Sequence, residues 1–261
     1  MAVSEHVRER LEQLFPAGEG GAFMALEETD PEFFERFAEF AFGEVPDMPL
    51  LECEERMDER TRFMGILAVL LGCQGCDAFR EMAGAALQAG VTPVEIREIV
   101  YQAAAYLGFG RVFPFFKALQ EVFRERNIAL PLEAQGTNTK ETRRETGTQC
   151  QVEIFGDGMR DFWKSGPEET RHINTWLAAN CFGDYYTRKG LDLRQREMVT
   201  FCFILAQGGC ESQLLSHAKG NMHMGNDRRF LIRLVSQCLP FIGYPRTLNA
   251  IAVINKAAEQ A

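Results

Sequence analysis

The sequence lacks the features of a membrane-spanning, secreted or nucleic-acid-binding protein. Its longest strongly apolar run, residues 63–71, is much shorter than the ~18 residues that a transmembrane helix requires. Residues 1–10 carry charged side chains early and contain no apolar stretch of the kind found in a secretory signal. Lys and Arg together number 28 against 37 Asp and Glu, and the net charge of −9 repels phosphates and anionic lipids. We therefore predict a cytoplasmic protein that binds neither nucleic acid nor a membrane.

Cysteine is not scarce, but its pattern does not indicate a disulfide scaffold. A long chain without a secretory signal keeps its thiols reduced, so we expect most of the 8 cysteines to be buried and inert. They are Cys53, Cys73, Cys76, Cys150, Cys181, Cys202, Cys210 and Cys238. No second Cys-x-x-Cys and no His pair completes a tetrahedral zinc set, so we expect no metal and no cofactor.

The chain also lacks alternating segments long enough to be convincing β-strands, whereas helical periodicity is frequent. Apolar helices are predicted over 59–72 and 194–207, and a second helix follows each, over 76–89 and 210–224. Gly90 and Gly225 suit the left-handed positions that end these second helices. A third helix follows in each half, with Thr92 and Asn226-Asp227 as its N-terminal signals. The fold class is therefore all-α.

Two halves of the sequence repeat each other. Asp58, Arg60, Arg62 and Cys76 recur 134 positions later, and Gly90, Gln102, Gly108 and Arg111 recur 135 positions later, after a one-residue insertion. Their counterparts are Asp192, Arg194, Arg196, Cys210, Gly225, Gln237, Gly243 and Arg246. Residues 126–148 are polar and rich in Thr, as in a linker. We therefore predict a first unit over 1–125, the linker over 126–148 and a second unit over 149–261.

The second half resembles the carboxymuconolactone decarboxylase and alkylhydroperoxidase-D superfamily. The family pattern has an Asp-x-x-x-Arg-Glu opening, matched by Asp192 to Glu197, and a His eight residues before a Gly, matched by His217 and Gly225. A Gly-aromatic-Pro segment also matches, at residues 243–245. The first half keeps the Asp and Arg of the opening but has Met82 at the histidine position, so its site looks degenerate.

This resemblance implies a helical fold in which the two tandem units form a pseudo-dimer. It also implies a homo-oligomer, with three chains giving a ring equivalent to six units. Apolar helices that exceed what two small units can bury alone favour self-association as well.

The family contains two chemistries, and this chain matches neither pattern completely. Lactone decarboxylases use acid–base chemistry, whereas alkylhydroperoxidase-D-like proteins use a Cys-x-x-Cys with a His four residues later. Here the Cys-x-x-Cys lies in the first unit with Arg80 at the histidine position, and the family histidine lies in the second unit with a single cysteine.

Cys73 and Cys76 are one candidate redox pair. Cysteines three apart at the start of a helix share a face, and the helix dipole favours a thiolate there, so the pair would cycle between dithiol and disulfide. The alternative is two buried thiols that have this spacing by chance.

Cys210, His217 and Glu197 form the second candidate site. Cys210 follows two glycines at a predicted helix start, which favours a low thiol pKa. His217 lies ~10 Å further along the helix axis, so a proton relay would have to pass through Gln213, a water molecule or Glu197. The alternatives are a core histidine, an inert cysteine and a Glu197 placed only for the helix dipole. His223 faces another side and is expected at the surface.

The leading functional hypothesis is a thiol-dependent peroxidase or disulfide oxidoreductase. Cys210 would be the peroxide-reactive thiol, His217 and Glu197 would relay protons, and a thiol reductant protein would be a partner. The alternative is a cofactor-free lactone decarboxylase or isomerase in which His217 is the acid or base. A third hypothesis is a helical assembly protein that has lost its chemistry. The substrate would be a hydroperoxide in the first case and a lactone in the second.

Overall fold

The computed structural model describes residues 3–16, 19–48 and 56–260, and these residues form helices and loops without any β-strand. The all-α prediction is confirmed. The helices of the first half are α1 (Glu5–Leu14), α2 (Gly21–Thr29), α3 (Pro31–Glu39), the π-helix η1 (Phe40–Glu44), α4 (Val45–Asp47), α5 (Glu59–Gly72), α6 (Cys76–Gln88), α7 (Pro93–Leu107) and α8 (Phe109–Glu125). Those of the second half are α9 (Arg143–Phe155), the short 3-10 helices η2 (Asp157–Met159) and η3 (Phe162–Lys164), α10 (Arg171–Trp176), the π-helix η4 (Leu177–Tyr186), α11 (Leu193–Gln207), α12 (Glu211–His223) and α13 (Arg228–Glu259).

Local signals fix where the main helices begin and end. The side chains of Asp58, Thr92, Asp192 and Asp227 each accept a hydrogen bond from a backbone N–H in the first turn of the helix that follows. These contacts satisfy N–H groups that have no partner within the helix. The glycines after α6 and α12 adopt positive φ values, +86° at Gly90 and +89° at Gly225, as the sequence predicted.

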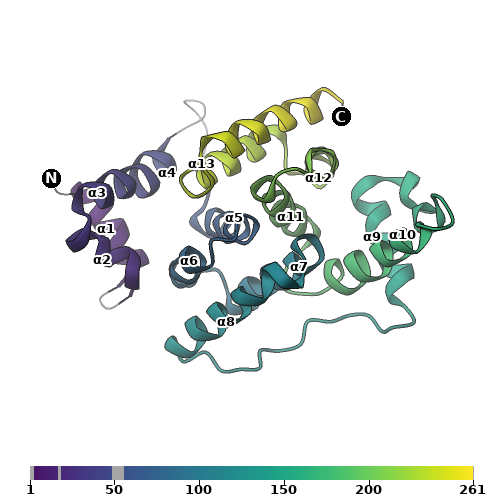
Figure 1. Ribbon diagram of the computed structural model, residues 1–261, viewed down its shortest axis with the longest axis horizontal. Coiled ribbons are helices and arrows are strands. Elements are labelled where there is room, and N and C mark those ends of the chain that lie inside the picture. The colour runs from purple at the N-terminus through teal and green to yellow at the C-terminus, as the bar shows by residue number, and fades with distance from the viewer. Residues whose placement is uncertain (1–2, 17–18, 49–55, 261) are drawn as a thin grey trace.

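The two halves share one arrangement from the α5 and α11 helices onward. Gly108 separates α7 from α8 with φ +80°, and Gly243 kinks α13 with φ +76°, so each unit ends in two helices joined at a left-handed glycine. Figure 1 shows α5 and α11 in the middle of the molecule, α1–α4 at one end and α9 and α10 at the other.

Several repeated residues hold the two units together. Arg62 on α5 donates from Nε to Oε1 of Gln237 at 3.0 Å, and Arg196 on α11 donates from Nη1 to Oε1 of Gln102 at 2.7 Å. Each pair joins one unit to the other, and the two pairs are related by the internal repeat. The tandem units therefore form the predicted pseudo-dimer. Across the junction, the arginine of each unit binds the glutamine of the other.

The connection between the units is shorter than the predicted linker. The chain runs without helix from Arg126 to Thr142 along the edge of the molecule (Figure 1), and α9 begins at Arg143. Residues 143–148, which we assigned to the linker on composition, form the first turns of this helix. No helix in the described part of the chain has the length and hydropathy needed to cross a bilayer.

Candidate active site

A buried carboxylate and a histidine meet between α11 and α12. Glu197 is fully buried, and its Oε2 lies 2.9 Å from Nδ1 of His217, which is 7% exposed. The sequence left open whether Glu197 serves only the helix dipole. Its complete burial against an imidazole shows instead that it is a partnered core carboxylate, because an unpaired buried charge is too costly to retain. Nδ1 faces Glu197, so Nε2 lies at the opposite edge of the ring.

A tyrosine hydroxyl binds the other oxygen of Glu197, and further hydroxyl groups bind that tyrosine. Tyr186 at the end of η4 donates to Oε1 at 2.8 Å and lies 2.7 Å from the hydroxyl of Thr200. Tyr106 from the first unit donates to the Tyr186 hydroxyl at 3.0 Å, and Gln102 donates to Thr200 at 2.7 Å. Burial raises the pKa of both tyrosines well above the ordinary value, so they remain protonated donors. The site is thus assembled from both units.

Aromatic rings enclose the imidazole. The rings of Tyr106 and Phe155 each stand edge-on to His217 with centroids 5.4 Å away. Phe155 also lines a surface depression of about 260 Å³, shared with Lys219 and His223 and completed by Ile154, Ser216 and Gly220. His223 is exposed, as the sequence predicted, and its Nδ1 lies 2.8 Å from the carbonyl oxygen of Ile154. The depression is therefore adjacent to His217 and carries a cationic lysine.

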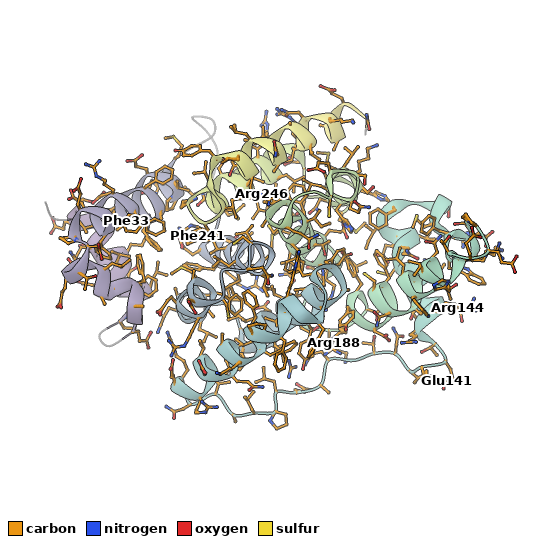
Figure 2. The ribbon with its side chains drawn as sticks, in the orientation of Figure 1. Phe33, Glu141, Arg144, Arg188, Phe241 and Arg246 are labelled. Carbon is orange, nitrogen blue, oxygen red and sulfur yellow. The ribbon has the colours of Figure 1, made fainter. Side chains whose placement is uncertain are left out.

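The corresponding positions of the first unit are apolar. The repeat places Phe63 opposite Glu197, Ile66 opposite Thr200 and Met82 at the histidine position, and all three are buried hydrophobic residues. Phe241 stands in place of Tyr106 and packs beside the N-terminal helices, with its ring 6.1 Å from that of Phe37 (Figure 2). The chain therefore holds one such polar network among its described residues.

Cys210 lies outside this network. It precedes α12 as predicted, is half-buried, and accepts a hydrogen bond from Nε2 of Gln207 at 3.2 Å. In the described part of the chain no hydrogen bond joins Cys210 to His217 or Glu197. Gln213 is exposed and accepts from the Ser212 hydroxyl instead. The structure therefore joins Glu197 to His217 but not to Cys210, and the bridge through Gln213 is not formed.

Cys73 and Cys76 lie on either side of a turn. Cys73 follows the last residue of α5 and is exposed, whereas Cys76 is the first residue of α6 and is half-buried. Both are free thiols. Partial desolvation raises the pKa of each thiol, whereas a shared helix start was expected to lower it. The two cysteines were expected at the start of one helix, but Cys73 lies in the turn after α5 and only Cys76 belongs to α6.

The remaining described cysteines are buried, as expected. They are Cys150, Cys181, Cys202 and Cys238, and burial raises the pKa of Cys181 to about 12. Cys53 lies outside the described residues. Within those residues, no group of three or more His, Cys, Asp and Glu side chains is arranged to hold a metal ion.

Sequence reasoning found Glu197 and His217 and missed Tyr106, Tyr186 and Thr200. A tyrosine or threonine in an amphipathic helix gives no signal of its own, because such residues occur throughout ordinary cores. The contact of Tyr106 with the second unit depends on how the two units pack.

The molecule is a tandem all-α protein with one histidine, bound to a buried carboxylate, close to the junction of its two units. The chain belongs to the carboxymuconolactone decarboxylase family, whose model matches residues 31–121 and 172–256, more than half of the sequence. The fold is similar to a crystal structure from Burkholderia xenovorans LB400, described as a candidate gamma-carboxymuconolactone decarboxylase subunit. The two share 18% identity with a TM-score of 0.53, over 98% of this chain and 97% of the other. A search of curated proteins finds no match.

Proposed function

We propose that the protein is an acid–base enzyme that decarboxylates or isomerises an unsaturated lactone, with His217 as the proton donor and acceptor. The observation that carries this proposal is the buried pair of Glu197 and His217, with Nδ1 and Oε2 2.9 Å apart. A carboxylate at Nδ1 fixes the tautomer of an imidazole and stabilises the cation that forms when Nε2 takes a proton. Tyr186 holds Glu197 in place through its second oxygen.

In a decarboxylation, the bond between the ring carbon and the departing carboxylate breaks and carbon dioxide leaves. The electron pair enters the conjugated lactone, and Nε2 of His217 delivers a proton to carbon. One proton is gained for each carbon dioxide lost, and the imidazole regains its proton from solvent. The Lys219 ammonium in the adjacent depression favours an anionic substrate. Phe155 lines this depression and also packs edge-on against His217, so a substrate held there would lie close to the imidazole.

Substitution of His217 tests this proposal, with gamma-carboxymuconolactone as the substrate and carbon dioxide release as the measurement. We expect His217→Gln to lower kcat by ~10²–10⁴-fold, the usual contribution of a positioned acid or base. Glu197→Gln should lower kcat as well, because the imidazolium loses its counter-ion. His172→Gln is the matched control, since His172 is exposed on α10 and packs only against Trp176 among aromatic rings. Wild-type turnover by a folded His217→Gln variant would refute the proposal.

A thiol peroxidase is the second candidate function, and the observation that favours it is the half-buried Cys210 with its Gln207 amide donor. Its thiolate would attack the peroxide O–O bond, forming a sulfenic acid and releasing water or an alcohol, and a thiol reductant protein would restore it. Thiol dependence separates the two functions. Cys210→Ser would abolish peroxide consumption if this candidate is correct and would leave lactone turnover unchanged if the first is correct.

A further inference from the structure

Gln151 on α9 is a polar side chain left without partners in the interior. It is fully buried, and neither Oε1 nor Nε2 has a hydrogen-bond partner among the described residues. The other unpaired buried side-chain atoms in those residues are each a single Nε of an arginine. An amide with both polar atoms unpaired is costly to bury, and such a cost in a folded protein requires an explanation.

Gln151 lies on α9 one helical turn before Phe155, whose ring contacts His217. Residues four apart on a helix share a face, so Gly147, Gln151 and Phe155 form one row. A Cβ added at Gly147 would lie 1.9 Å from the carbonyl oxygen of Ala178, so the backbone of η4 covers that end of the row. At the other end, the ring of Phe155 lies 5.4 Å from that of His217. Gln151 lies between the two.

The neighbours of Gln151 on α9 belong to a buried cluster that includes a partner of Glu197. The neighbouring residues Cys150 and Ile154 belong to a small buried cluster with Tyr186, and Tyr186 donates to Glu197. Ile154 and Phe155 also line the depression beside His217. A purely structural residue at this position would be better as leucine or methionine, because the cluster offers an amide no internal partner.

We propose that Gln151 is a substrate-binding residue that pairs with the carboxyl group or lactone oxygen of the molecule whose reacting carbon meets His217. The amide nitrogen donates to a carboxylate or carbonyl oxygen, and the amide oxygen accepts from a hydroxyl or a protonated carboxyl. The ligand enters from the depression past Phe155, and the unpaired amide then gains its partners. This inference rests on the proposed function, since it assigns the second anchor point of the same substrate.

Methionine has a shape similar to that of glutamine but lacks the amide. We therefore expect Gln151→Met to stabilise the fold and to weaken substrate binding. Removing an unpaired buried group should raise Tm by about 2–4 °C, the shift typical of a 1 kcal/mol gain in a chain of this size. KM for gamma-carboxymuconolactone should rise at least tenfold with a smaller change in kcat. Gln151→Leu provides a second variant. Gln135→Met is the matched control, because Gln135 is a buried glutamine that donates to the carbonyl of Glu133, so its loss should lower Tm and leave KM unchanged.

A binding measurement keeps this inference distinct from the catalytic proposal. In the His217→Gln background, gamma-carboxymuconolactone should raise Tm without being consumed, and adding Gln151→Met should abolish that shift. Full turnover by His217→Gln would overturn the catalytic role of the histidine, while KM of the Gln151→Met single variant would still test Gln151. An unchanged KM in Gln151→Met, or a ligand-induced shift in His217→Gln that persists after Gln151→Met is added, would overturn the role of Gln151.

Discussion

Cys210 precedes α12 and His217 lies on it, yet the two side chains contact different residues. His217 is held by a buried carboxylate between two aromatic rings. Cys210 is half-buried and contacts an amide at the end of α11. The thiol and the imidazole therefore have separate hydrogen-bond partners.

At this scale we predict that iodoacetamide at neutral pH modifies Cys210 faster than Cys202 or Cys238. The latter two are fully buried, and burial raises the pKa of Cys202 well above the ordinary value, so its reactive thiolate is scarce. Mass spectrometry of the alkylated peptides over time gives the three rates. His217→Ala should leave the Cys210 rate unchanged, although the sequence alone predicted slower reaction through a relay. A slower Cys210 in that variant would show that the two side chains are coupled.

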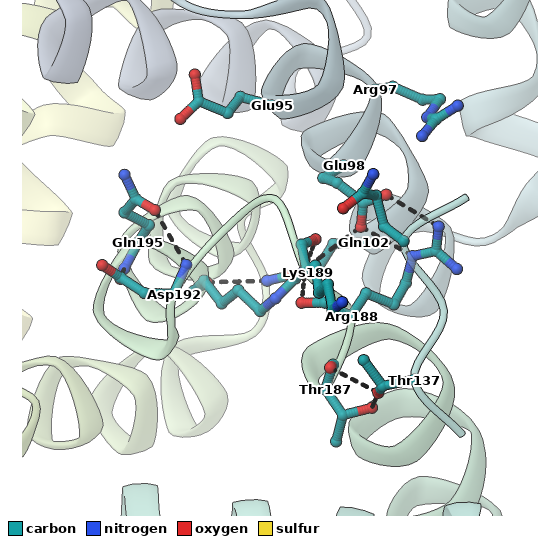
Figure 3. A network of polar contacts seen from close by, with 12 residues as sticks. Glu95, Arg97, Glu98, Gln102, Thr137, Thr187, Arg188, Lys189, Asp192 and Gln195 are labelled. Atoms are coloured by element: carbon teal, nitrogen blue, oxygen red, sulfur yellow. Dashed lines mark hydrogen bonds and ion pairs between the residues drawn. The ribbon is translucent and has the colours of Figure 1, made fainter. Parts of the chain in front are cut away.

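Among the elements, the contact of α7 with α11 and the end of η4 depends on one buried carboxylate. Glu98 is fully buried on α7 and accepts two hydrogen bonds from Arg188, at 2.8 and 2.9 Å. Its Oε2 also lies 3.3 Å from Nη2 of Arg196. Figure 3 shows Glu98 and Arg188 together with Gln102, close to the chain segment that carries Lys189. These residues join the first unit to the second beside the candidate active site.

We predict that Glu98→Ala lowers the free energy of unfolding by about 3–5 kcal/mol, the range for breaking a buried ion pair by removing one partner. The loss is large because the Arg196 guanidinium would remain buried without its carboxylate. Guanidinium chloride unfolding followed by circular dichroism measures the change. Glu141→Ala is the control, since that side chain is exposed on the connection between the units (Figure 2) and should have little effect. Equal stabilities of the two variants would contradict the role of the Glu98 cluster.

On the scale of the whole molecule, the internal repeat extends to the exposed surface. Phe109 and Phe113 near the start of α8 are 64% and 59% exposed, and their repeat partners Tyr244 and Leu248 are 61% and 62% exposed. Each pair is spaced by one helical turn, so each unit presents the same small apolar patch. Large exposed apolar side chains gathered in this way are typical of interaction surfaces.

We predict that the protein self-associates through these patches, with a trimer of chains as the expected state. Light scattering coupled to gel filtration measures the mass. The double variant Phe113→Ser and Leu248→Ser should shift it towards the monomer, because both patches lose their main apolar side chain. Leu130→Ser is a control, since this 49% exposed leucine lies on the connection between the units. A wild-type monomer at micromolar concentration would contradict the prediction.

The sequence by itself determined the helices and the repeat. Thr92, Asp192 and Asp227 start helices through hydrogen bonds to residues three positions away, and Gly90 ends one through its own φ. These signals involve only residues close together in the sequence, so the helix boundaries can be predicted from the sequence alone. The repeat could also be recognised from the sequence, because identities at a constant spacing do not depend on packing. The family motif then singled out Glu197 and His217.

Only the tertiary structure decided which side chains meet. Tyr106 reaches Tyr186 across 80 positions, and Gln102 reaches Thr200 across 98, because α7 of the first unit packs on the second. Cys210 was predicted to communicate with His217 through Gln213, a water molecule or Glu197, yet α11 supplies Gln207 to the thiol and Glu197 to the imidazole. Hydrogen bonds between distant segments depend on the relative positions of whole helices, which are set by the sum of many apolar contacts. A local sequence pattern therefore cannot predict these hydrogen bonds.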